Sequence, residues 1–252
     1  MEVALNRPAI GATEWSIRVE LAGLYRALAK LGMTDLIYNH ITHQVPGEPG
    51  CFLINSYGML YSEVTASSLY KIDISGNVLS DPDNGFSFNP AGFVIHSAIH
   101  AARDDIRCVL HTHTRASIAV SAMKTGLLPI SQQACKFDDA ISYHDFNGPV
   151  LDLTERERLV RDLGDNKVMM LRNHGTLVCG TTIAETFLNA YFLEFACKIQ
   201  VDAMSASAEL QIPPPEVQEN SRRLYRRHDM DGKLEWQAMI RQLAVAGENY
   251  AI

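Results

Sequence analysis

Apolar residues recur at helical spacing in several parts of the chain. Between residues 13 and 31 they form one stripe, in steps of four and three positions, and Gly32 follows it. This spacing predicts an amphipathic helix over residues 13–31 that ends at the glycine. Similar segments predict further helices over residues 93–103, 115–124, 154–164 and 182–208.

Short apolar runs separated by turn residues predict strands. Pro46-Gly47 and Gly76-Asn77 are turn signals around the first runs, and their spacing suits an antiparallel meander. No Gly-x-Gly-x-x-Gly segment follows a predicted strand, so a dinucleotide-binding Rossmann fold is disfavoured. The pattern therefore predicts an α/β protein with a mostly antiparallel sheet covered by helices. The runs lie at residues 51–55, 70–74, 106–111 and 167–171.

One linker-like segment interrupts the chain near its C-terminal end. It reads Ile-Pro-Pro-Pro-Glu at residues 212–216, and a charged segment with helical spacing follows it. We therefore expect one domain over residues 1–211 and a helical extension over residues 212–252. The extension is expected to pack on the domain or on a neighbouring subunit.

Composition and charge narrow the range of partners. The chain has 252 residues and a formal net charge of −7, which disfavours nucleic acid and anionic membranes as partners. It has no run of about 20 apolar residues that could span a membrane, and its first residues lack the pattern of a secretory signal. The five cysteines are scattered and never spaced Cys-x-x-Cys, as expected of free thiols in a reducing compartment. The protein is therefore expected to be cytoplasmic.

Two histidines stand at the end of the strand predicted over residues 106–111. Alternate residues of a strand face the same side, so His111 and His113 can point into one space and bind one metal ion. His174 also follows a predicted buried strand, and Gly175 after it allows close approach of the backbone. Three imidazoles at strand ends would hold a divalent ion and leave coordination positions open for a substrate. The sequence therefore predicts a catalytic metal site.

Other interpretations of the histidines compete with this one. A His-x-His pair also occurs where a strand simply emerges into solvent. His96 and His100 are spaced i, i+4 on a predicted helix and could chelate a metal, but the helix is apolar and lacks a His-Glu-x-x-His pattern. A polar contact near the site is the preferred role for His96. His40 and His43 are expected to flank a loop, either as pocket residues or as exposed ones.

With these residues in place, the chain resembles the class II aldolase/adducin family from about Ser16 to Met204. The resemblance rests on the segments YNHITHQ, DISGNVL, AGFVIHSAIHAARDDIRCVLHTHT, VSAMKTGLLPISQ and LRNHGTLVCG. It implies a single three-layer α/β/α domain with a largely antiparallel central sheet, in a homotetramer whose sites lie near subunit boundaries. It also implies a divalent metal, zinc before iron or manganese, held by His111, His113 and His174.

Three positions depart from the sugar-phosphate aldolases of this family. Those enzymes carry a proton-transferring glutamate four residues before the helix histidine, which is His96 here, and Gly92 stands in its place. Two serines that bind substrate phosphate are replaced by Pro90 and Ala91, which lack the hydroxyl donors. Loss of a positioned general base reduces the rate by a factor of about 10²–10⁴. A sugar-phosphate aldolase on the usual plan is therefore not expected.

The loops that bind substrate in those aldolases match this chain only in part. Tyr57 stands where a small residue would be expected. The substrate is accordingly expected to be a small carbonyl compound without a phosphate. The matching positions, predicted here to contact the substrate, are Asn39, His40, Thr42, Asn55, Ser56 and Gly58.

The pattern is similar to the adducin head domain and to bacterial adducin-like proteins, and three functions follow from the resemblance. The first is a metal-dependent lyase that acts next to the carbonyl of a small unphosphorylated oxo- or hydroxy-acid, by C–C cleavage, C–C formation or decarboxylation. His96, His40 or Tyr143 would move the protons. The second is a non-haem Fe(II) oxygenase or decarboxylase of 2-oxo acids on the same three histidines. The third is a non-catalytic binding module like the adducin head.

Overall fold

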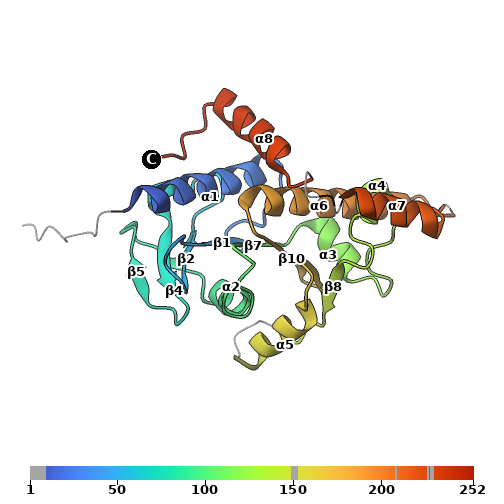
Figure 1. Ribbon diagram of the computed structural model, residues 1–252, viewed down its shortest axis with the longest axis horizontal. Coiled ribbons are helices and arrows are strands. Elements are labelled where there is room, and N and C mark those ends of the chain that lie inside the picture. Colours follow the sequence, from blue (N-terminus) through green and yellow to red (C-terminus); the bar gives the residue numbers. More distant parts are fainter. Residues whose placement is uncertain (1–9, 149–152, 208, 226, 228–229) are drawn as a thin grey trace, which may run out of the picture.

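An eight-stranded sheet forms the centre of the computed structural model, which describes residues 10–148, 153–207, 209–225, 227 and 230–252 (Figure 1). The strand order is β5-β4-β2-β1-β7-β10-β9-β8, and every neighbouring pair is antiparallel except β8 and β9. A separate pair, β3 (Ser56–Tyr57) and β6 (Ser87–Phe88), forms a two-stranded sheet. The strands of the large sheet are β1 (His40–Gln44), β2 (Cys51–Ile54), β4 (Tyr70–Asp73), β5 (Val78–Ser80), β7 (Cys108–Thr112), β8 (Ile141–His144), β9 (Val168–Leu171) and β10 (Gly175–Gly180).

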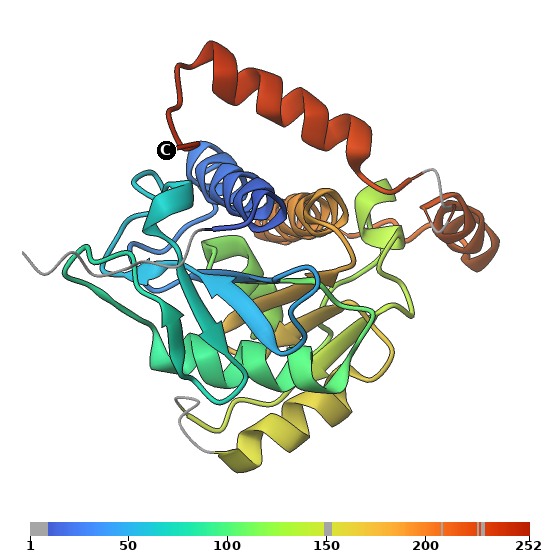
Figure 2. The same ribbon diagram turned by 60° about the vertical axis from the view of Figure 1, so that its left-hand side comes forward.

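Helices cover both faces of this sheet. In Figures 1 and 2, α1 and α6 lie on one face with α8 packed over them, and α2 and α5 lie on the other. The helix α5 connects β8 to β9, which is why this one pair of strands is parallel. The predicted three-layer α/β/α architecture with a largely antiparallel sheet is confirmed. The helices are α1 (Ala12–Lys30), α2 (Pro90–Ala102), α3 (Arg115–Ser121), α4 (Gln132–Cys135), α5 (Leu153–Leu163), α6 (Ile183–Ser205), α7 (Pro215–Tyr225) and α8 (Lys233–Val245), with a short 3₁₀ helix at Ala66–Ser68.

Alternation along β7 shows how the sheet separates two hydrophobic cores. Leu110 packs in the core beneath α1 and α6, whereas Val109 packs in the core formed with α2 and α5. Because successive side chains of a strand point to opposite faces, His111 faces the same side as Val109. The end of β7 therefore delivers its histidine to the α2 face.

Two strands that the sequence analysis did not predict flank β7. The expectation of a loop at residues 40–43 is wrong, because these residues belong to β1, where His40 pairs opposite His111. On the other side of β7, β10 places Leu177 opposite His111. All five residues of β1 are buried although most are polar, so a search for hydrophobic runs passes over this strand.

The C-terminal region contributes to the first of the two cores. Trp236, Met239 and Leu243 of α8 are buried there with residues of α1 and α6. This helix therefore packs on the α/β/α layers of its own chain. The division into a domain and an extension at residue 211 stays a prediction.

Two further observations concern the cysteines and membrane spans. All five cysteines are free thiols, and four of them are buried. Within the described ranges, no helix combines the length and the apolar character that crossing a membrane requires.

Candidate metal centre

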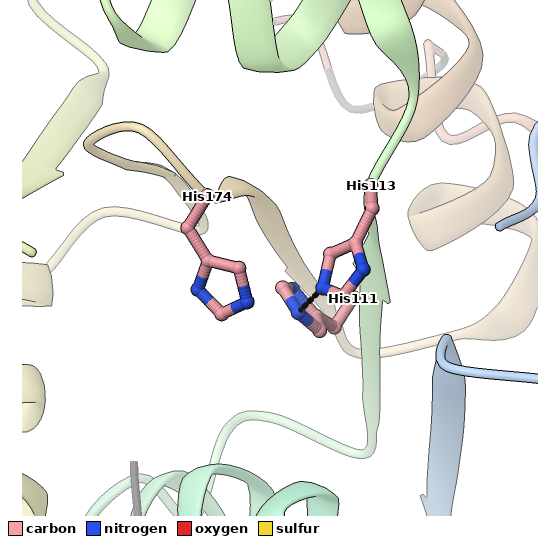
Figure 3. A group of neighbouring side chains, drawn as sticks. All are labelled: His111, His113 and His174. Atoms are coloured by element: carbon pink, nitrogen blue, oxygen red, sulfur yellow. Dashed lines mark hydrogen bonds between the residues drawn. The ribbon is translucent and has the colours of Figure 1, made fainter. Parts of the chain in front are cut away.

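Three histidines from two parts of the sheet meet at one end of β7. His111 lies on β7, His113 directly follows it, and His174 lies in the turn between β9 and β10. Their ring centroids are 4.5, 4.8 and 4.7 Å apart, and one ring nitrogen of each lies within 4.8 Å of the others. Figure 3 shows the three imidazoles turned toward one another, with Nε2 of His111 and Nε2 of His113 2.7 Å apart. The predicted metal ligands are thus brought together.

A tight turn places His174 beside the other two rings. Asn173 and Gly175 on either side of it have φ values of +60° and +154°. A Cβ atom at Gly175 would lie 2.2 Å from the carbonyl oxygen of Thr112, so only glycine allows the turn to press against the end of β7. The close backbone approach expected from the His-Gly pair is present.

Hydrogen bonds at the far side of two rings fix their orientation. Nδ1 of His111 donates to the carbonyl oxygen of Thr176 at 2.8 Å, and Nδ1 of His113 donates to the carboxylate of Asp35 at 3.2 Å. Both rings then present the lone pair of Nε2. Two such lone pairs 2.7 Å apart repel each other unless a cation lies beside them, so this donor set suits a metal ion.

Asp35 is a residue of the site that the sequence analysis missed. It lies in a loop far from the histidines in sequence, and nothing in its local pattern marks it. The side-chain oxygen of Asn39 accepts a hydrogen bond from the backbone N–H of Asp35 at 2.7 Å, which holds this loop. Asn39, predicted to contact substrate, therefore acts in this structure by positioning Asp35, while its buried Nδ2 has no partner among the described residues.

Burial keeps the three imidazoles in the form that binds metal. It lowers the pKa of His111 well below its usual range, and the neighbouring His113, His40 and His174 lower it further. Burial and His113 lower the pKa of His174 to about 4. Burial also lowers the pKa of His113, against the opposing effect of Asp35. All three rings are therefore neutral at pH 7, as metal coordination requires.

A buried chain of polar groups leads away from the centre. The ring of His40 lies 5.0 Å from that of His111, and its Nδ1 is 3.0 Å from Nε2 of His96 on α2. The hydroxyl of Thr42 is 2.8 Å both from Nδ1 of His96 and from Nε2 of His100. The structure thus places His40 at the centre, with His96 and Thr42 behind it. The side chains of His96 and His100 belong to this series of hydrogen-bonded polar groups and not to the three-histidine cluster.

A cavity of about 460 Å³ opens beside the cluster. It brings together the three histidines with His40 and with several residues that the sequence analysis did not select. The lining residues are Asp35, Tyr38, His40, Tyr57, Asn89, Ile95, His111, His113, Phe146 and His174.

Five of the six predicted substrate contacts do not line this cavity: Asn39 and Thr42, described above, and Asn55, Ser56 and Gly58. The side-chain oxygen of Asn55 accepts from the Tyr25 hydroxyl at 2.9 Å, and the hydroxyl of Ser56 donates to the carbonyl of Ser68 at 2.8 Å. A Cβ atom at Gly58 would lie 2.6 Å from the ring of Phe86. Within this chain the three residues make these internal contacts, and their predicted role in substrate binding stays a prediction.

Tyr143 also lies outside the cavity lining. Its hydroxyl accepts a hydrogen bond from the backbone N–H of Leu127 at 3.0 Å, and the guanidinium of Arg172 lies 4.2 Å from the centre of its ring. Within this chain its contacts tie β8 to the segment after α3. The predicted proton-transfer role of Tyr143 has no support from these contacts and stays a prediction.

Comparison with known proteins finds relatives along most of the chain. Residues 19–201 match the family described as Class II Aldolase and Adducin N-terminal domain. The crystal structure of an aldolase II superfamily protein from Pseudomonas syringae is 48% identical, with 96% of this chain and 98% of that one covered and a TM-score of 0.91. An L-fuculose 1-phosphate aldolase from Glaciozyma antarctica PI12 is 25% identical, with 98% of both chains covered and a TM-score of 0.84. Alpha-adducin of Mus musculus is 44% identical over 192 residues, which are 76% of this chain and 26% of the adducin.

Proposed function

Because the chain belongs to the class II aldolase and adducin family, we propose that it is a metal-dependent lyase. Its substrate is a small unphosphorylated oxo- or hydroxy-acid, and it forms or breaks a C–C bond, or releases CO₂, next to the carbonyl. The observation that supports this proposal most directly is the meeting of three neutral imidazoles beside an open cavity. A structural zinc site has four protein ligands, whereas three ligands leave a position for substrate.

The residues present fit a divalent metal ion. His111, His113 and His174 would hold it, with Asp35 and the carbonyl of Thr176 orienting two of the rings. The imidazole set suits zinc, which we expect, and also iron; manganese, which prefers oxygen ligands, is the third candidate. When bound, the metal supplies Lewis-acid polarisation of the carbonyl oxygen.

His40 is the group that we propose to move the proton. It lines the cavity without belonging to the three-histidine cluster. Its Nδ1 is bonded to His96, so Nε2 is the nitrogen left to face the substrate. His96 in turn is held by Thr42, which fixes the orientation of both rings. His96 therefore serves as the positioning partner and as the next group along the path of the proton.

Two other functions use the same residues. A three-histidine set leaves three adjacent positions on an octahedral iron, which would suit an Fe(II) oxygenase or decarboxylase of 2-oxo acids. The similarity to alpha-adducin over 192 residues favours a binding module without catalysis. The identity of the metal separates these functions from the lyase.

Elemental analysis of the purified protein tests the proposal. We expect about one zinc or manganese ion per chain, and none in the variant that combines His111→Ala with His113→Ala. His43→Gln is the matched control, because His43 is equally a buried histidine of the sheet but lies outside the cluster. Full metal occupancy in the double variant would contradict the assignment of these histidines as metal ligands. Iron with O₂ uptake on 2-oxo acids would favour the oxygenase, and a metal-free protein the binding module.

The proposal extends to the assembly and the compartment that the family resemblance implies. We expect a homotetramer in the cytoplasm, with the C-terminal helices packed on their own domain or on a neighbour. Size-exclusion chromatography with light scattering measures the number of chains. A monomer at micromolar concentration would contradict the tetramer.

A further inference from the structure

Within the described part of this chain, no lysine or arginine lines the cavity beside the histidine cluster. Among the described residues that line it, Asp35 is the one charged side chain apart from the imidazoles, and its carboxylate is bonded to His113. A phosphate carries about 1.5 to 2 negative charges at pH 7 and binds through cations or several N–H donors. The described lining has no lysine or arginine, and its uncharged polar side chains are those of Asn89, Tyr38 and Tyr57.

The polar residues behind the cavity wall are engaged inside the protein. Asn55 and Ser56 bond to Tyr25 and to the carbonyl of Ser68, and Ser56 also accepts from Asn84 at 2.9 Å. Both side chains are 1% exposed or less. Recruiting them for a phosphate would break these bonds and leave buried groups unpaired. Asn55 and Ser56 are therefore not available to a phosphate in this packing.

Aromatic side chains form much of the cavity lining. Tyr38 and Tyr57 line the cavity with ring centroids 6.5 Å apart. Phe146 lies next to His174, with 6.1 Å between the ring centroids. Tyr38 is 49% exposed and Phe146 51%, so large parts of both rings remain free to contact a ligand. Ile95 adds a further apolar surface to the lining.

We infer that the substrate carries an aryl ring, or a flat apolar group of similar size, on the carbon chain that bears the carbonyl. This inference rests on the proposed function. The carbonyl end lies at the three histidines and His40, and the ring lies against Tyr38, Tyr57 and Phe146. A cavity of about 460 Å³ has room for both parts. Apolar and edge-to-face contacts with these side chains would select the ring over a sugar phosphate.

Isothermal titration of the zinc-loaded protein with two 2-oxo acids tests this inference. Phenylpyruvate and pyruvate present the same oxo-acid and differ in the phenyl ring. We expect phenylpyruvate to bind about tenfold more tightly, as burial of roughly half a ring face predicts. Phe146→Ala and Tyr38→Ala should each remove about three- to tenfold of that preference.

Phe195→Ala provides the matched control, because Phe195 on α6 is also partly exposed, at 41%, and does not line the cavity. It should leave the affinities for both acids as they are. Dihydroxyacetone phosphate should bind no more tightly than dihydroxyacetone, and tighter binding of the phosphate would overturn the inference.

The outcomes separate the inference from the proposed function. Equal, zinc-dependent affinities for the two acids would overturn the ring preference and leave the lyase proposal standing. A preference for phenylpyruvate that survives both aromatic substitutions would place the ring elsewhere and also overturn the inference. If the zinc-loaded protein binds neither acid, the proposed function fails together with the inference.

Discussion

The imidazole of His40 lies directly against the α-carbon of Gly92. A Cβ atom at position 92 would be 2.7 Å from two carbon atoms of the ring, well inside van der Waals contact. His40 cannot easily yield, because it is buried and bonded to His96. A glutamate at position 92 and an imidazole at position 40 therefore exclude each other. The glycine at position 92 and the position of the His40 ring are thus linked through this contact.

We predict that Gly92→Ala destabilises the protein by about 1–3 kcal/mol, because even a single methyl group overpacks the His40 ring. The double variant with His40→Ala should lose much less than the sum of the two single variants. Urea denaturation of the four proteins measures the coupling. Gly11→Ala is the control, because no atom lies within 4 Å of an added Cβ there. Additive effects at residues 40 and 92 would contradict the contact.

A second prediction concerns the outer carboxylate. Asp35→Ala removes the acceptor that orients His113, and loss of such a partner typically weakens metal binding by about 10- to 100-fold. Competition with a chromogenic zinc chelator measures the affinity. Asp104→Ala, at another exposed aspartate, should leave the affinity unchanged. Equal affinity of the Asp35 variant and the wild type would show that His113 needs no such partner.

The three-histidine cluster could be predicted from the sequence, whereas Asp35 could not. The strand period of two aims His111 and His113 at one point, and the His-Gly pair after a buried strand adds His174, so local pattern suffices for these three. Asp35 reaches His113 across 78 positions of the chain through a loop whose course is set by packing. Long-range contacts of this kind leave no periodic signal.

The strand that carries His40 was missed for a related reason. Residues 40–44 are buried because polar partners from other elements satisfy them, as His96 and His100 satisfy Thr42. Hydrophobic alternation cannot detect a strand that is buried by hydrogen bonding. Asn55 and Ser56 illustrate a related limit of local pattern, because residue types alone do not reveal which way side chains face, and in this structure both bond inside the protein.

Acid sensitivity is expected from the buried histidines. Burial, with His43 and Arg107 nearby, lowers the pKa of His100 to about 3, whereas the unfolded chain has an ordinary value near 6.5. Between these values the unfolded state binds more protons, so the stability is complete above about pH 6.5 and falls as the pH drops toward 3. At pH 5 this one group should lower the unfolding free energy by about 2 kcal/mol relative to pH 7.

The variant His100→Gln keeps a polar side chain at this position and removes the titration. Urea denaturation at pH 7 and pH 5 should therefore show a smaller loss of stability in the variant, by about 2 kcal/mol. Other buried histidines, such as His43, whose pKa burial lowers to about 4, will keep part of the pH dependence. Identical losses of stability in the variant and the wild type would mean that protonation of His100 does not destabilise the folded state.

The last prediction concerns the turn that carries His174. Gly175→Ala should cost about 2–4 kcal/mol, because the new Cβ atom would collide with the Thr112 carbonyl at a φ of +154°. Gly47→Ala is the matched control, since its φ is +80° but no atom lies within 4 Å, so it should cost about 1 kcal/mol. Relief of the collision must move the turn away from β7 and His174 away from His111. We therefore expect chelator competition to show a weaker zinc affinity for Gly175→Ala and an unchanged zinc affinity for Gly47→Ala. Equal effects of the two substitutions on stability and on zinc affinity would contradict the close approach of this turn.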